Sequence, residues 1–341
     1  GNHEFDEGDG RLAELIEMAN FPILSSNMQP EPASPLYRVR DQIKPYVIQE
    51  IDGEKVGIIG ILKVEKTKNS SLVSDDVTFT PEIQAARKYV SELEAMGVNK
   101  IILLSHVGYY NDIVFAKNVA GLDVIVGGDT HSLLDSSGDI EAFGLSVDYH
   151  GQTGPFEGYT HEGVENEDLG AYPTTVIGPE GDPVEIVTAW SYAYGVGILD
   201  IDFDKEGRVI TAEGNIVIPV DGPFLQQNAE GTRVEVSKDV RDSILKTVAA
   251  SRVFRYEQPA KIVEDILSPY REEIEARRNE QIGTISETMG YTRIPTPFSA
   301  GQTPTGSYAA YVVAEAFKQA NPRIDVAIQN AGGVRTQFLE G

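Results

Sequence analysis

Short apolar runs and amphipathic stretches alternate along the first part of the chain. Apolar residues recur at helical spacing over residues 11–20 and 111–120, which predicts two helices. Uninterrupted apolar runs at 101–104 and 122–126 predict strands that are buried on both faces. Strand–helix–strand alternation of this kind predicts a layered α/β core whose functional sites lie at strand ends.

Two local signals predict further elements in this part of the chain. Apolar runs at 46–51 and 56–62 flank an Asp-Gly pair at 52–53, which strongly indicates a β-hairpin. The pair Thr80-Pro81 predicts the start of a helix, with Thr80 as its N-cap and Pro81 as its first helical residue.

The pattern changes after residue 131. Residues 132–170 are irregular and rich in Gly, Asp and Glu, which predicts a long surface excursion. Regular patterns then return and predict strands at 174–177, 197–203, 208–220 and 282–288, and helices at 236–251, 262–278 and 306–320. Alternation of apolar and polar residues at 198–203 is typical of a half-exposed antiparallel sheet.

Composition and charge limit the kinds of partner. The chain has 341 residues, 41% of them apolar, which is enough for two domains. Its 53 acidic and 28 basic residues give a net charge of -25. Nucleic-acid binding is not expected, because it needs a basic surface. For the same reason, a site for a phosphate ester must supply its own positive charge.

Two features are missing from the sequence: cysteine residues and a long apolar run. There are no cysteines, which excludes a disulfide scaffold, a thiol nucleophile and a zinc–thiolate site. No run approaches the roughly 20 apolar residues of a membrane helix, so no membrane span is expected. The chain begins with Gly inside a motif, and we interpret it as a fragment of a longer protein.

The first candidate chemistry lies at residues 1–6, which read GNHEFD. Asn2 and His3 are side chains that can bind metals or transfer protons, and Asp6 is close enough to hydrogen-bond to His3. A carboxylate on one ring nitrogen fixes the tautomer and raises the basicity of the other nitrogen. Six residues alone could equally form a solvated terminus.

Two further histidines strengthen this interpretation. His106 follows the apolar run at 101–104, and His131 follows the run at 122–126 through Gly-Gly-Asp-Thr. Each histidine alone could be a partly buried residue hydrogen-bonded to backbone. In an extended segment, however, Asp129 and His131 would point to the same side and could face one metal cluster. Ligands of N and O without S suit Zn, Mn, Mg or related divalent ions.

Several motifs in order make the chain resemble the bacterial 5'-nucleotidase family, whose N-terminal domain is a dinuclear metallophosphatase. The motifs are GNHEFD at 1–6, LSHVG at 104–108, GGDTH at 127–131 and QNAGGVR at 329–335. The last motif, with Ile294 and Pro295 upstream, is similar to the subgroup that also cleaves NAD. The resemblance implies a nucleotide substrate and two divalent metal ions.

The resemblance also implies a role for each matching residue of the metal centre. Asn2, His106 and Asp129 would bind one metal, and His131 would bind the other. Asp129 stands where the family commonly has a histidine, so oxygen replaces nitrogen in the ligand set. His3 and Asp6 would form a catalytic dyad that stabilises the phosphoryl transition state and assists the leaving group.

The resemblance places the substrate-binding residues near the end of the chain. Arg335 would contact the nucleotide or its phosphates through its planar guanidinium, and Arg293 would assist. Asn330, Gly332 and Gly333 would line the same pocket. A loop arginine such as Arg335 could instead be structural and pair with a carboxylate.

Two parts of the family's site have no counterpart in this sequence. The first metal motif, D-x-H, and a bridging Asp would precede Gly1, and two aromatic residues that sandwich the base would follow Gly341. The isolated chain is therefore expected to bind metals and nucleosides poorly. Missing N- and C-terminal segments of the parent protein would complete the site.

The predicted architecture is an α/β four-layer α-β-β-α metallophosphatase domain with part of an α/β nucleotide-specificity domain. The catalytic domain is assigned to 1–220, the linker and interdomain helix to 221–265, and the start of the C-terminal domain to 266–341. The family's habit suggests a periplasmic, exported or cell-surface protein.

The predicted activity of the parent protein is hydrolysis of 5'-nucleotides to nucleoside and phosphate. NAD and nucleotide-sugar pyrophosphates are further candidate substrates. The alternatives are a 2',3'-cyclic phosphodiesterase or a thiosulfate-ester hydrolase (thiosulfohydrolase) of the same superfamily, and a non-catalytic binding protein or inactive fragment.

Overall fold

The computed structural model describes residues 1–151, 153–164, 169–229, 231–278, 280, 286–290 and 304–320. The chain forms two compact units, Gly1–Gln258 and Pro259–Gly341. The assignment of 1–220 and 266–341 to a catalytic and a nucleotide-specificity domain stays a prediction.

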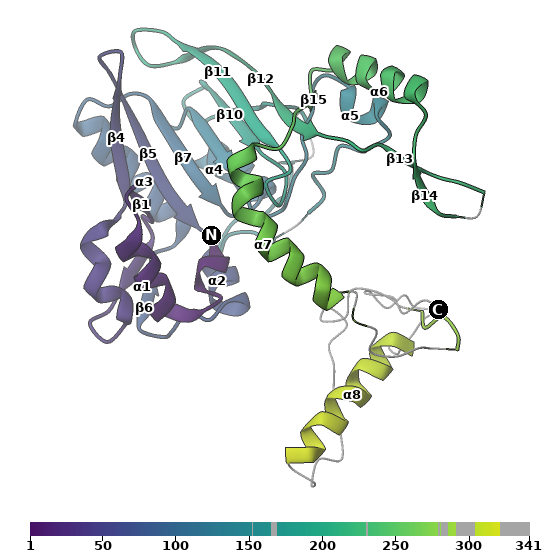
Figure 1. Ribbon diagram of the computed structural model, residues 1–341. Helices are drawn as coiled ribbons and strands as arrows, with labels where there is room; N and C mark the ends of the chain where they lie inside the picture. Colours follow the sequence, from purple (N-terminus) through teal and green to yellow (C-terminus); the bar gives the residue numbers. More distant parts are fainter. Residues whose placement is uncertain are drawn as a thin grey trace. The chain divides into compact units, whose positions relative to one another are not determined.

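A six-stranded sheet forms the centre of the first unit (Figure 1). Its strands, in spatial order, are β4 (Tyr46–Ile51), β5 (Glu54–Leu62), β7 (Ile101–His106), β8 (Val124–Gly127), β10 (Pro183–Thr188) and β9 (Thr174–Ile177). The four central strands run parallel, and the two edge strands are antiparallel to their neighbours. The predicted β4–β5 hairpin is confirmed, and Asp52 and Gly53 at its turn both have positive φ, as a type I′ turn requires.

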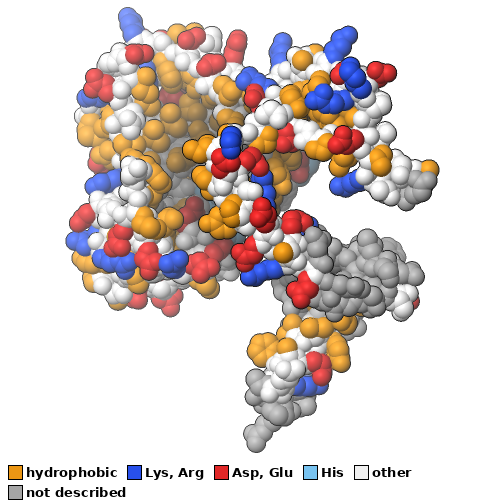
Figure 2. All heavy atoms as spheres, viewed as in Figure 1, with side chains coloured by type: hydrophobic (Ala, Val, Ile, Leu, Met, Phe, Trp, Pro, Cys, Tyr) orange, Lys and Arg blue, Asp and Glu red, His pale blue; other side chains and the backbone are white. Residues whose placement is uncertain are grey.

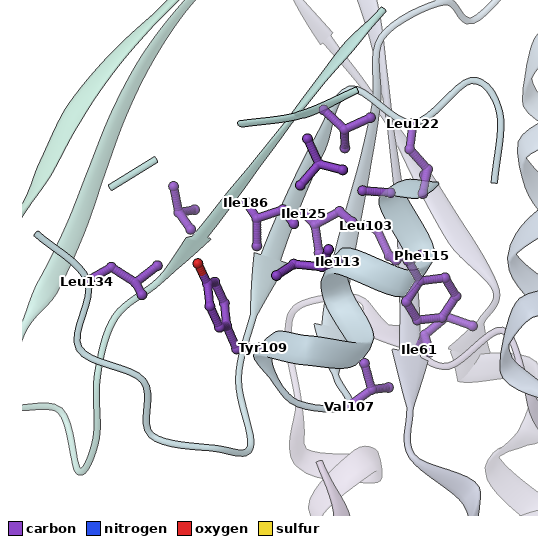
Figure 3. Close-up of a cluster of buried hydrophobic side chains, with 14 of the residues drawn as sticks. Ile61, Leu103, Val107, Tyr109, Ile113, Phe115, Leu122, Ile125, Leu134 and Ile186 are labelled. Carbon is purple, nitrogen blue, oxygen red and sulfur yellow. The ribbon is translucent and has the colours of Figure 1, made fainter. Parts of the chain in front are cut away.

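Helices α3 (Glu82–Ala95) and α4 (Tyr109–Asn118) bury one face of this sheet. Figure 3 shows Leu103, Ile125 and Ile186 of neighbouring strands beside Ile113 and Phe115 of α4. All five side chains are fully buried in the main hydrophobic core. These contacts hold the parallel strands in register, and their carboxyl ends meet at one edge.

A second sheet packs against the first and completes the predicted layers. It contains β11 (Val196–Phe203), β12 (Val209–Val220) and β15 (Phe254–Tyr256), and β10 contacts both β11 and β12. Helix α6 (Lys238–Ala250) packs on β15. The order from α3 and α4 through two sheets to α6 confirms the α/β fold class. A small hairpin, β13 (Leu225–Gln227) and β14 (Arg233–Glu235), follows β12.

A smaller group of elements surrounds a second core at the start of the chain. It consists of η1 (Asn2–Phe5), α1 (Gly8–Met18), β1 (Ile23–Leu24), β2 (Met28–Pro30), η2 (Pro35–Gln42), β3 (Ile43–Lys44), α2 (Val64–Ser70) and β6 (Val77–Phe79). Phe5, Leu12, Ile16 and Leu36 are among its buried residues. Leu62 at the end of β5 belongs to the same core, which ties the opening residues to the edge of the main sheet.

The other face of the six-stranded sheet is only partly covered. Leu104 of β7 and Val126 of β8 are register partners, and they are 48% and 37% exposed on two central strands. A cavity of about 660 Å³ lies between this face and β11, with Ile102 and Leu199 among its lining residues. Figure 2 shows hydrophobic side chains gathered over β5 and β7 on this side.

Three expectations need correction. Helix α3 begins at Glu82, one residue later than predicted; Pro81 holds the N-cap position, where no side chain caps the helix. The described residues within 132–170 are mostly irregular, as predicted, but they include the short helix α5 (Asp139–Ala142). They are not only a surface excursion, because Leu134 and Phe156 pack into the main core. Strand β10 was not predicted at all, although it lies inside the sheet.

The second unit contains two described helices. Helix α7 (Lys261–Arg278) has no buried residue. Ion pairs between neighbouring turns, such as Lys261 with Asp265 and Arg277 with Glu273, lie on its surface and stabilise the helix, and large apolar side chains such as Ile266 are exposed beside them. Helix α8 (Pro304–Ala320) follows, and Thr305 at its start donates a hydrogen bond to the Met289 carbonyl. Most of the strand expected at 282–288 lies outside the described residues.

Candidate metal and active site

The predicted metal ligands lie at the carboxyl ends of the parallel strands. His106 is the last residue of β7, and Asp129 follows β8 by two residues. The His106 Nε2 atom lies 3.6 Å from the Asp129 Oδ1 atom. Two segments separated in sequence thus bring an imidazole and a carboxylate together, as expected for sites in α/β sheets.

Asp129 is almost fully buried, with 1% of its side chain exposed. Its Oδ1 atom pairs with the Lys66 ammonium of α2. Its Oδ2 atom is buried without a hydrogen-bond donor among the described residues. A buried carboxylate oxygen without a partner is costly, and a cation would satisfy it.

Asn2, like Asp129, has a buried oxygen without a donor among the described residues. Its Nδ2 atom donates to Ser70 Oγ at 3.2 Å and to Ser71 Oγ at 3.4 Å. These bonds fix the amide, while Oδ1 has no donor in the described part of the protein. The neighbouring Gly1 lies against the His106 ring, where a Cβ atom would come within 2.5 Å of Nε2. The opening loop therefore sits directly beside the end of β7.

The His106 imidazole is held in its neutral form. Burial lowers the pKa of His106 to about 4, and the nearby Asp129 carboxylate opposes the shift. Neutral imidazole is the form that binds metal ions, because protonation blocks the ligating nitrogen. His106 therefore offers a free nitrogen at neutral pH.

His3 and Asp6 lie next to each other at the surface. The His3 Nδ1 atom is 2.8 Å from the Asp6 Oδ2 atom. The two side chains are 72% and 50% exposed, so the second ring nitrogen, Nε2, is accessible to solvent. A carboxylate on Nδ1 favours the tautomer in which Nε2 accepts a proton.

The glycines before Asp129 are required by close packing. A Cβ atom on Gly127 would lie 2.2 Å from Asp112 Oδ2, and one on Gly128 would lie 3.1 Å from His106 Nδ1. Asp112 itself is fully buried and accepts a hydrogen bond from Ser105 Oγ at 2.5 Å. Burial raises the pKa of Asp112 well above its usual value, and the Asp112 side chain packs directly against Gly127 of the loop.

His131 has a different environment. Asp129 and His131 have φ of 79° and 55°, so the segment is not extended and the expected alternation of side chains does not apply. The His131 ring packs edge-on against Tyr192, with centroids 4.9 Å apart. The structure therefore places Asp129 beside His106 and the opening loop that carries Asn2 against the His106 ring, while His131 contacts an aromatic residue.

These residues suit part of a metal site. Two buried oxygens without donors, Asn2 Oδ1 and Asp129 Oδ2, and the neutral His106 provide the N and O ligands that divalent ions accept. Among the described residues, no group of three or more His, Cys, Asp or Glu side chains forms a complete centre. The ligand roles remain predictions.

The predicted substrate-binding residues lie outside the described part of the chain. These are Arg293, Asn330, Gly332, Gly333 and Arg335.

Helix α2 contributes residues that were not predicted. Lys66 binds Asp129, and Ser70 binds Asn2, so this helix braces both candidate ligands. The preceding Lys63 is buried and donates to the Pro155 carbonyl at 3.1 Å. A signal was present in the sequence, because Lys63, Lys66 and Lys68 form a basic cluster in a strongly acidic chain.

The chain is similar to known nucleotidases over its whole length. The NAD 5'-nucleotidase of Haemophilus influenzae is 35% identical over 344 residues, which cover 100% of this chain and 53% of that protein. The chain thus spans about half the length of the curated relatives it matches. No protein-family model matches it.

Solved structures give the same result. The Haemophilus influenzae NAD nucleotidase superposes with a TM-score of 0.69 and 33% identity over 83% of this chain and 52% of that chain. A 5'-nucleotidase precursor from Thermus thermophilus gives a TM-score of 0.64 and 28% identity over 100% of this chain and 54% of that chain.

Proposed function

We propose that the parent protein of this chain, which belongs to the 5'-nucleotidase family, is a metal-dependent hydrolase that releases phosphate from 5'-nucleotides. One observation carries the proposal: Asn2 and Asp129 each have a buried oxygen without a donor among the described residues, Asp129 lies beside the neutral His106, and Gly1 next to Asn2 packs against the His106 ring. Such a set of acceptors favours a divalent cation.

Each residue of the site has a role that follows from its contacts. Asn2, His106 and Asp129 would hold one cation, and His131 would contribute to a second. When bound, a pair of such ions supplies Lewis acidity and lowers the pKa of water. The Ser70 contact fixes the Asn2 amide in place before a cation binds, and the Lys66 ammonium pairs with Asp129 Oδ1 until the cation replaces it.

The exposed His3–Asp6 pair would act on the phosphoryl group. With Asp6 on Nδ1, the accessible His3 Nε2 would exchange a proton with a phosphoryl or leaving-group oxygen. Lys66 adds a positive charge at this edge of an acidic protein. Arg335, with Asn330, Gly332, Gly333 and Arg293, would bind the rest of the nucleotide.

The substrate range would include dinucleotides. A relative matched along the whole chain is named NAD 5'-nucleotidase, and we carry that substrate to this protein as a proposal. Water would add to one phosphorus, the bridging P–O bond would break, and two mononucleotides would leave.

Further segments of the parent protein would complete the fold and the site. The partly covered sheet face, with Leu104 and Val126 exposed, supports this proposal, because central strands normally bury both faces. The matched relatives are also about twice as long as this chain. The completing segments would cover this face and supply the remaining metal ligands.

Export of the parent protein is a further proposal. The Thermus thermophilus neighbour is described as a precursor, which supports a periplasmic or cell-surface location. Within the described residues, none of the helices combines the length and apolarity needed to cross a membrane.

The test uses the full-length parent protein. Bound metal is measured by mass spectrometry. Phosphate release is assayed with AMP, ring opening to the nucleoside monophosphate with 2',3'-cyclic AMP, and sulfate release with a thiosulfate ester. We expect hydrolysis of AMP and at least one divalent ion per chain, with His106→Ala losing both. His150→Ala is the matched control, because His150 is an exposed histidine outside the site.

Two results would contradict the proposal. A wild-type protein that binds metal but hydrolyses only the cyclic or thiosulfate substrate belongs to one of the alternative activities. A His106→Ala protein that keeps its metal and its activity removes the ligand assignment.

A further inference from the structure

The segment that follows β10 has an unusual backbone. Trp190, Tyr192 and Ala193 have φ of 64°, 51° and 58°, a region that side chains larger than glycine rarely adopt. The Tyr194 N–H donates to the Ser191 carbonyl at 2.9 Å and closes a turn. Clusters of such residues are typical of functional sites, where the surrounding structure holds an otherwise unfavourable conformation.

This backbone arranges a continuous row of rings, Trp190, Tyr192 and Tyr194, which we call the aromatic strip. Trp190 packs against the main core and lies 5.4 Å from Tyr194, centroid to centroid. Tyr194 lies 5.8 Å from Tyr192, and Tyr192 lies 4.9 Å from His131, both edge-on. The strip therefore runs from the core to a predicted metal ligand.

The outer rings of the strip are exposed. Tyr192 is 72% exposed and Tyr194 is 55% exposed. An edge-to-face contact occupies the rim of one ring and one face of its partner. The high exposure of Tyr192 and Tyr194 leaves further ring surface available to stack on another planar group. Exposed tyrosines held in a fixed arrangement beside a site offer a stacking surface at low entropic cost.

The chemistry of dinucleotides requires such a surface. A mononucleotide carries one organic substituent on its phosphorus and one planar base. A dinucleotide pyrophosphate carries a substituent on each phosphorus, so a second planar ring must lie elsewhere when the first occupies the nucleoside pocket. The strip begins at His131, so a ring that extends from the phosphoryl group would reach Tyr192 first.

We propose that the aromatic strip binds the second planar ring of a dinucleotide substrate and so determines whether the enzyme accepts dinucleotides besides mononucleotides. This inference rests on the proposed function and adds a specificity site to it. Electron-rich Tyr faces would favour a cationic pyridinium ring, and stacking would accept a purine as well.

The test compares substrates in the full-length parent protein. Values of kcat/KM are measured for AMP, for NAD and for diadenosine diphosphate, in the wild type, Tyr192→Ala, Tyr194→Ala and Tyr194→Phe. Stacking on one aromatic side chain typically changes binding about tenfold or more. We therefore expect Tyr194→Ala to lower the ratio of NAD to AMP activity roughly tenfold through KM, and Tyr194→Phe to restore it.

Phe21→Ala is the matched control, because Phe21 is a 64% exposed aromatic residue outside the strip, and its substitution should leave the ratio unchanged. An equal loss for NAD and AMP in Tyr194→Ala would overturn the inference. So would a wild type that hydrolyses AMP but neither dinucleotide, and so would an unchanged ratio, which would assign the strip to contacts within the longer protein. A wild type without any nucleotide hydrolysis would instead overturn the proposed function.

Discussion

The two faces of the six-stranded sheet differ sharply, although one residue separates them along each strand. On the helix-covered face, Leu103 and Ile125 are fully buried, while on the other face Leu104 and Val126 are 48% and 37% exposed. The apolar run at 101–104 indicates burial on both faces, and this chain covers the second face only in part. His106 lies two residues beyond Leu104, so the candidate site lies at the carboxyl end of the partly covered face.

The largest expected effect is a difference in the free energy of unfolding between substitutions on the two faces. Leu103→Ala should lower the free energy of unfolding by about 2–5 kcal/mol, because it leaves a cavity in a packed core. Leu104→Ala in the same chain should cost less than about 1 kcal/mol, because its side chain is half exposed. Urea unfolding of both variants measures the difference.

The same pair can be tested in the parent protein. There Leu104→Ala should become costly, since we propose that other segments cover this face. Equal costs for both leucines in the isolated chain would contradict the distinction between the faces.

One titrating group on each side of the sheet should make the stability of the folded chain depend on pH, in opposite directions. On the covered side, folding raises the pKa of Asp112 above its ordinary value of 3.8. The folded state then holds a proton that the unfolded state has released, and stability falls as pH rises above 3.8. On the open side, folding lowers the pKa of His106 from 6.5 to about 4. Here the unfolded state binds the extra proton, and stability falls as pH drops from 6.5 toward 4.

Two variants test these slopes in metal-free buffer. Asp112→Asn keeps an acceptor for Ser105 and should remove the loss at high pH, while His106→Gln should remove the loss at low pH. Each single group contributes at most about 1.4 kcal/mol per pH unit. Thermal unfolding between pH 4 and 8 measures both. Parallel pH profiles for the wild type and a variant would contradict the assignment for that residue.

A smaller effect concerns the cation that Asp129 already contacts. Lys66 places a positive charge on Asp129 Oδ1, so it competes with a metal ion at this carboxylate. Lys66→Gln should raise the affinity of the parent protein for a divalent ion by about tenfold, since nearby like charges oppose each other. Lys68→Gln is the control. Calorimetric titration measures the affinity, and weaker binding in Lys66→Gln would show that Lys66 supports the site by positioning Asp129.

Local signals were strong enough to predict much of the fold. The Asp-Gly turn gave the β4–β5 hairpin, and continuous apolar runs gave β7 and β8. Strand β10 was not predicted because Pro183 and Glu185 interrupt its apolar pattern. Its place in the sheet comes from pairing with β8, a contact across about 60 residues, which no local pattern reports.

The candidate site was predictable only in part, for a similar reason. Motif spacing singled out Asn2, His106 and Asp129, because their residue types carry metal chemistry. The Lys66–Asp129 pair joins residues 63 positions apart, and neither partner signals the other in sequence. The left-handed backbone at Asp129 and His131 is imposed by tertiary packing, so the extended geometry expected there was wrong.

The most direct measurement is a crystal structure of the zinc-loaded parent protein with anomalous diffraction at the zinc edge. We predict a zinc ion about 2.0–2.2 Å from Asn2 Oδ1, a ring nitrogen of His106 and an oxygen of Asp129, with Lys66 displaced from the carboxylate. A second ion should lie next to it. A fully loaded crystal whose zinc ions do not contact Asn2, His106 or Asp129 would contradict the account.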